Sequence, residues 1–167
     1  MYEGYIWQMF KVCINNKDAN NSSHKLAEML IESGYSHYAG SLLKTVRKNF
    51  GGHVDSLIQN SLLLGKAFYS EGSYSLASDA YEHAFILSKE TNNKIGIATS
   101  NIKLAKIAFI RGKVEAAKLY LHLGECMFKN TYQSYYFENI LLQCEFLLES
   151  ENKFELDYDL DEYFIKL

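Results

Sequence analysis

The feature of this chain that most constrains its fold is a turn glycine that recurs at nearly constant spacing. Gly34, Gly72 and Gly112 follow one another at almost equal intervals in a chain of 167 residues. Apolar residues flank each glycine at helical spacing, as Leu64 and Ala77 do on the two sides of Gly72. A period of roughly 20–50 residues indicates repeated supersecondary units that bury their apolar faces by stacking. The sequence therefore predicts an all-α protein of antiparallel helical hairpins.

The hairpin around Gly72 resembles the tetratricopeptide repeat (TPR). That family has a Leu-Gly pair on the first helix, a Gly-x-Tyr turn, and small and aromatic residues on the second helix. The matching residues are Leu64-Gly65, Gly72-Ser73-Tyr74, Ala77, Tyr81 and Ala84. A looser copy follows, with Leu104-Ala105, Gly112-Lys113-Val114, Ala117, Leu121 and Gly124. The resemblance covers about residues 20–130, and it implies a TPR-like α-solenoid of about eight helices.

We expect one domain over 1–167. An N-terminal helix and linker occupy 1–19, three repeats occupy 20–53, 54–93 and 94–130, and a degenerate capping hairpin occupies 131–167. In the last hairpin Asp157 stands where the repeat needs a small residue, and terminal repeats are expected to be atypical. From residue 130 onward there are 9 acidic and 2 basic side chains. This acidic end is either a solvated cap or a docking surface for a basic partner.

Several function classes find no support in the sequence. The net charge of −3 gives no footprint for nucleic acid, and the five histidines have no metal-ligand spacing. No nucleotide-binding or nucleophile motif occurs, so we expect neither an enzyme nor a cofactor or metal. Three cysteines at no motif spacing, without a signal peptide or an apolar span, favour a cytoplasmic protein that does not enter a membrane.

Binding by the first helix of each hairpin is the remaining expectation, because the resemblance implies that these helices line a concave groove. The predicted peptide- or protein-binding residues are Gln59, Lys66, Tyr69, Thr99, Lys103, Lys106 and Phe109. Further inward positions are His24, Lys25, Glu28, Ile31, Leu62, Leu63 and Ile102. Lys66 and Lys106 are equivalent, so they are expected to form a basic ladder for an acidic group or a free carboxylate. The alternative is that they are ordinary solvated lysines.

The clamp by which chaperone-binding members of the family hold a carboxylate does not carry over. Glu28 and Leu63 occupy two of its positions, and an acid repels a carboxylate while Leu cannot donate a hydrogen bond. Binding of a chaperone tail in that manner is therefore not expected.

The long period and the absence of proline are similar to the repeats of bacterial and phage peptide-sensing regulators (Rap, PlcR and arbitrium-receptor type). Abundant Asn, Lys, Ile and Tyr suit an AT-rich genome of that kind. The stretch before the first repeat is too short for the effector module of those regulators, so we expect a stand-alone or truncated array. The resemblance implies a non-enzymatic regulatory adaptor that binds a protein or a short peptide. The alternative is a structural or assembly subunit that oligomerises through the array, and a homodimer is compatible with either.

Overall fold

The computed structural model describes residues 19–49 and 53–128, together with the single positions Gly4, Gln8, Lys11, Val12 and Leu142. Apart from those positions, the expected N-terminal helix and the acidic capping hairpin lie outside the described residues.

The described part of the chain is all-helical, without a strand, which confirms the predicted fold class at that level. Its six α-helices are α2 (Ala19–Glu32), α3 (Ser36–Val46), α4 (Val54–Ser70), α5 (Tyr74–Glu90), α6 (Lys94–Ile110) and α7 (Val114–Phe128). A 3-10 turn, η1 (Arg47–Asn49), extends α3. The expected number of about eight helices remains a prediction. No helix in the described residues has the length and apolar character needed to cross a membrane.

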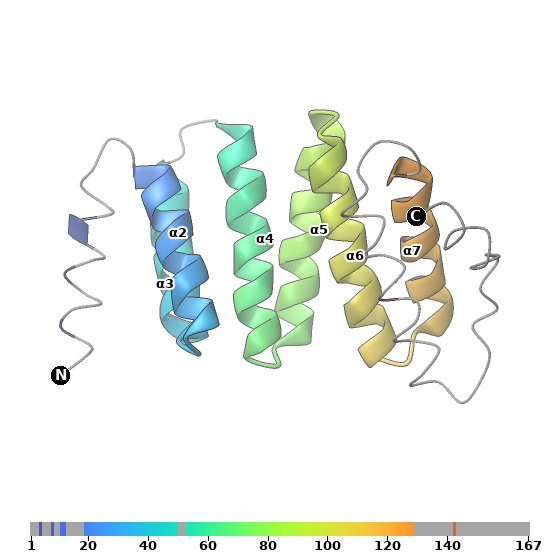
Figure 1. The fold of residues 1–167 in the computed structure, drawn as a ribbon, viewed down its shortest axis with the longest axis horizontal. Helices are drawn as coiled ribbons and strands as arrows, with labels where there is room; N and C mark the ends of the chain where they lie inside the picture. The colour runs from blue at the N-terminus through green and yellow to red at the C-terminus, as the bar shows by residue number, and fades with distance from the viewer. Residues whose placement is uncertain are drawn as a thin grey trace, which may run out of the picture.

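The helices stand in chain order from one end of the molecule to the other, with their axes roughly aligned (Figure 1). Each helix contacts the next, so neighbours run antiparallel across their short connections. Helix α2 also contacts α4, and α4 also contacts α6. The odd and even members of the row therefore form two sides, with α4 between α2 and α6 on one of them.

Four of the connections share one turn geometry. Gly34, Gly72 and Gly112 have φ values of 82°, 73° and 70°, and Asn92 has a φ of 53°. At each turn the amide of that residue donates to the carbonyl three residues back, and the next amide donates to the carbonyl five residues back. This is the Schellman pattern, which ends a helix on a residue in the left-handed conformation. The loop between α5 and α6 is thus the same turn as those inside the hairpins, with Asn92 in the place of glycine.

Small residues bring the helices close together. Ala77 and Ala117, which the repeat pattern places at helix contacts, are both fully buried. A Cβ added to Gly65 on α4 would lie 2.5 Å from Cε1 of Tyr81 on α5, far inside van der Waals contact. A Cβ added to Gly96 on α6 would lie 2.9 Å from Cβ of Ser88. The approach is therefore tight both within a hairpin and between two hairpins.

Replacing Gly65 by Ala should destabilise the protein. The new methyl group must displace the buried ring of Tyr81, and overpacking of this kind costs about 1–3 kcal/mol. Chemical denaturation followed by far-UV circular dichroism measures the change.

Gly40→Ala on α3 is the matched control. A Cβ at Gly40 meets only Cδ1 of Leu64, at 4.0 Å, so the substitution should be neutral or stabilising by up to about 1 kcal/mol. Equal effects of the two substitutions would contradict the assigned contact between α4 and α5.

Candidate functional site

The predicted binding residues come from two helices on the same side of the row. Helix α4 supplies Gln59, Lys66 and Tyr69, and α6 supplies Thr99, Lys103, Lys106 and Phe109. Gln59 and Lys66 are exposed, whereas the other five are half-buried. A half-buried side chain presents one edge to solvent while neighbours fix its position, which suits a binding surface better than a freely moving side chain does.

Tyr69 connects the two helices of this surface. The ammonium group of Lys106 lies over the Tyr69 ring, 5.8 Å from its centroid. The ring also meets Tyr74 of α5, at 5.5 Å between centroids and an interplanar angle of 62°. A cation over an aromatic face is attracted by the ring quadrupole, by about 0.5–1 kcal/mol where it is exposed. The contact with Lys106 joins Tyr69 to the first helix of the next hairpin.

Lys66 makes a contact that was not expected. Its Nζ lies 3.7 Å from Oε1 of Glu32 on α2, and both side chains are largely exposed. Exposed ion pairs of this kind contribute little to stability and are screened by salt. The Glu32 carboxylate nevertheless offsets the Lys66 charge locally, so the positive character of the surface is stronger on α6 than on α4.

Four inward positions of the expected groove are instead part of the core. His24, Ile31, Leu63 and Ile102 are all buried, with exposed fractions of 8%, 7%, 4% and 2%. Leu63 packs in a cluster with residues of α2 and α3, and Ile102 packs with Ala117 and Leu121 of α7. Because α4 also touches α2 and α6, positions between the groove and the helix seam are covered. The expectation that these four residues line an open groove is corrected on this point.

A polar cluster between the first and second hairpins was missed in the sequence. Arg47 of η1, Ser61 of α4 and His83 of α5 meet there. One guanidinium nitrogen, Nη2 of Arg47, lies 3.0 Å from Nε2 of His83, and Oγ of Ser61 lies 3.0 Å from Nδ1. The three residues are far apart in the sequence, at a spacing that matches no motif, so only the packed helices reveal the cluster.

A serine beside a histidine resembles half of a catalytic triad, but the third residue has the wrong charge. In a triad a carboxylate orients the imidazole and stabilises its protonated form. Here a guanidinium, which can only donate, takes that place: Nη2 of Arg47 lies 3.0 Å from Nε2 and 3.4 Å from Nδ1 of the imidazole. Ser61 is also almost fully buried. The cluster is therefore better explained by a neutral imidazole that joins two hairpins than by a base that activates a nucleophile.

The environment of His83 lowers its pKa, through burial and the nearby Arg47 charge, with Glu90 acting in the opposite direction. Burial also lowers the pKa of His24 on α2. A histidine whose pKa is lower in the folded state binds its proton more readily when the chain unfolds. Its contribution to stability is complete above the unfolded pKa of about 6.5 and is lost as the pH falls towards the folded value.

We expect the midpoint temperature of thermal unfolding of the wild-type protein to decrease as the pH is lowered from about 7.5 to about 5.5. His83→Gln should reduce this slope, because glutamine cannot be protonated, while His24 continues to contribute. Thermal unfolding monitored at several pH values measures the slope. His53→Gln, which removes an exposed imidazole at the start of α4, is the matched control. An unchanged slope in the His83 variant would contradict the lowered pKa of His83.

Within the described ranges, no group of three or more His, Cys, Asp or Glu residues is placed to hold a metal ion. Comparisons of the chain with protein-family models, with curated proteins and with solved structures find no match.

Proposed function

We propose that this chain is a TPR-like α-solenoid that acts as a non-enzymatic regulatory adaptor. In this proposal it binds an extended protein segment or short peptide along the side formed by α2, α4 and α6. The contacts of α2 with α4 and of α4 with α6 support an inner side of the array made by these three helices. The inner side of a solenoid is where repeat proteins offer an extended binding surface.

The contact between Lys106 and Tyr69 is the observation that carries the proposal. It places a cation and two aromatic rings, those of Tyr69 and Tyr74, at the junction of two hairpins. Aromatic rings offer contact area at low conformational cost, and a lysine held over them is available to an acidic group. An extended peptide that crosses from one hairpin to the next would meet these groups together.

The charge of the proposed surface changes from α2 to α6, and this change favours one orientation of a charged ligand. The residue equivalent to Lys66 and Lys106 in the first hairpin is Glu28, and Glu32 lies one turn beyond it. On this surface α2 carries two acids beside Lys25, a small acidic excess, whereas α6 is basic with Lys103 and Lys106. Complementary charge favours a peptide with its acidic group or carboxylate over α6 and a basic group towards α2. We further propose a cytoplasmic, bacterial or phage protein related to the peptide-sensing regulators.

Charge reversal of Lys66 and Lys106 together should weaken binding of acidic peptides by tenfold or more, which corresponds to about 1.4 kcal/mol or more. Fluorescence anisotropy with labelled acidic octapeptides measures the affinity. Binding by the wild-type protein should also weaken with added salt, because charges are screened over about 10 Å at 0.1 M ionic strength.

Reversal of Lys89 and Lys94 is the control, since these exposed lysines border the turn between α5 and α6. This variant should bind as the wild type does, and both variants should keep their helicity by circular dichroism. If the Lys66/Lys106 variant retains full affinity for the same peptide, the proposed surface is wrong.

A structural or assembly role is the second candidate, and exposed apolar side chains favour it. Leu76 and Ile86 of α5 and Leu119 and Leu123 of α7 are between 42% and 58% exposed. Exposed apolar surface marks association sites, and these are the large exposed apolar side chains of α5 and α7 in the described residues. Sedimentation velocity distinguishes the two functions, because an assembly subunit forms oligomers that Leu119→Lys disrupts, whereas an adaptor keeps its state in that variant.

A further inference from the structure

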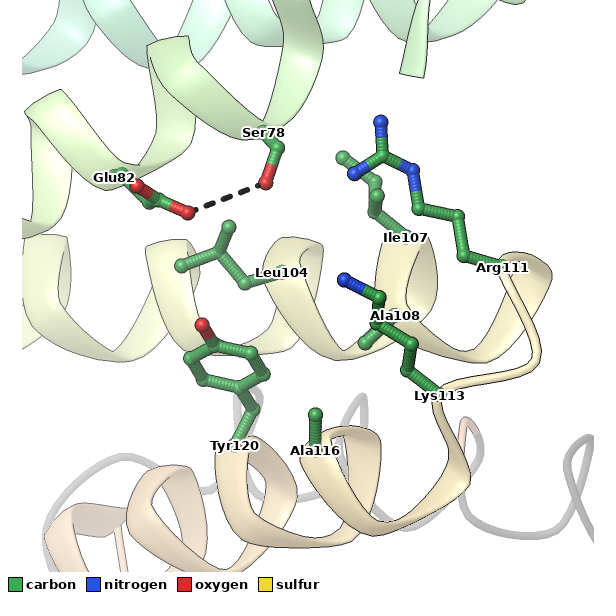
Figure 2. A pocket seen from close by; sticks show the side chains of 9 residues that line it. All are labelled: Ser78, Glu82, Leu104, Ile107, Ala108, Arg111, Lys113, Ala116 and Tyr120. Atoms are coloured by element: carbon green, nitrogen blue, oxygen red, sulfur yellow. Dashed lines mark hydrogen bonds between the residues drawn. The ribbon is translucent and has the colours of Figure 1, made fainter. Parts of the chain in front are cut away.

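A cavity of about 160 Å³ lies between α5 and α7, above α6 (Figure 2). Its floor is apolar and consists of Leu104, Ile107 and Ala108 of α6 and Ala116 of α7. The three α6 residues are buried and held by the core, so the floor exists before any ligand arrives. Preformed apolar concavities with a few polar groups at the edge are the usual form of ligand sites.

The cavity lies on a different face of α6 from the proposed groove. Its lining residues Leu104, Ile107 and Ala108 of α6 follow the i, i+3, i+4 spacing of one helix face, and Arg111, directly after the helix, continues that face. Thr99, Lys103 and Lys106 follow i, i+4, i+7 on a face rotated by about 120°, at about 100° per residue. A ligand in the cavity would therefore leave the groove free.

The rim carries opposite charges on its two sides. Arg111 and Lys113, at the turn between α6 and α7, extend towards the cavity from one side. Glu82 and Ser78 of α5 stand on the other side, where Oγ of Ser78 donates to Oε1 of Glu82 at 3.4 Å. The ion pairs within the described part of the chain are formed by other residues, and neither Arg111 nor Lys113 takes part in one. The rim thus offers two cations to an anion, with an acceptor across from them.

The volume of the cavity restricts the size of the group that it can hold. Drug-sized ligands occupy pockets of roughly 300–1,000 Å³, whereas a cavity of about 150 Å³ holds one benzene ring. The floor therefore accommodates a single apolar side chain. A guanidinium binds a carboxylate through two parallel hydrogen bonds, and an ammonium adds a third donor.

We propose that this cavity binds the C-terminal residue of a peptide or protein whose last side chain is aliphatic. The side chain lies on the floor, the terminal carboxylate binds Arg111 and Lys113, and the Glu82 carboxylate accepts the amide N–H of that residue. This site is independent of the proposed groove, because it uses other residues on another face of α6.

Titration of the ¹⁵N-labelled full chain with N-acetyl-alanyl-leucine, followed by NMR, tests the proposal. We expect saturable shifts at residues 78–82 and 108–116 with a dissociation constant on the order of 1 mM, as suits so small a ligand. N-acetyl-alanyl-leucinamide, which lacks only the carboxylate, should bind at least fivefold more weakly. Equal affinity for acid and amide, or an absence of saturable shifts, would overturn the proposal.

Two variants assign the contacts. Arg111→Gln with Lys113→Gln should weaken binding of the acid at least fivefold, and Ala116→Leu should abolish it by filling the cavity. The matched control is Lys89→Gln with Lys94→Gln, which removes two exposed lysines near the other end of α6, about 25 Å away. Full affinity in the Arg111/Lys113 variant would overturn the assignment even if the Ala116 variant does not fold. Tighter binding of free leucine than of the acetylated dipeptide would overturn the assignment to a peptide end.

Discussion

The contact between the Tyr81 ring and the bare backbone of Gly65 sets the distance between α4 and α5, and the surfaces on either side depend on distances of this kind. An alanine at Gly65 would collide with the ring, and an alanine at Gly96 would collide with Ser88 on the next seam. Fully buried alanines at positions 77 and 117 have the same role on α5 and α7. The small residues set how closely the helices approach, and large buried side chains such as Tyr81, Ile107 and Leu121 fill the rest of the seams. The cation and rings of the proposed groove gather on one face, and the cavity above α6 opens on another.

Local patterns in the sequence were sufficient to predict most of the backbone, because helix period and turn glycines act over a few residues. The all-α class, the left-handed turns at Gly34, Gly72 and Gly112 and the buried alanines all follow from them. The left-handed turn at Asn92 does not follow from the sequence pattern, since asparagine adopts this conformation without requiring it. Contacts between distant helices were not predictable, because they depend on how far each side chain extends across a seam. The Arg47–His83 hydrogen bond, the Lys66–Glu32 ion pair and the burial of Leu63 and Ile102 belong to this class.

The polar cluster at the first junction differs in kind from the seams that follow it. Helices α4 to α7 are joined by three-residue turns and packed through small residues, whereas α3 is followed by η1 before α4 begins. At that junction Arg47 reaches His83, and Nδ2 of Asn60 donates to the carbonyl of Leu43 at 3.0 Å. Hydrogen bonds depend on direction more strongly than apolar contacts do, so they fix the rotation of the first hairpin against the second. The acidic residues of α2 thereby keep a defined position relative to α4, which stands between them and the basic residues of α6.

The uniform turns have a consequence for how such a chain can grow or shrink. Gly72, Asn92 and Gly112 follow one another at equal intervals, and α4, α5 and α6 each have 17 residues, so one helix with its turn is the geometric step. Helices of the two sides of the row alternate with that step. A tandem duplication or loss of one such step would preserve every turn but move every downstream helix from one side of the row to the other. Only a change by two steps, a whole hairpin, returns each face to its own side. Insertions and deletions that change the number of helices are therefore constrained by the surfaces that they rearrange, and not by the backbone geometry of the turns.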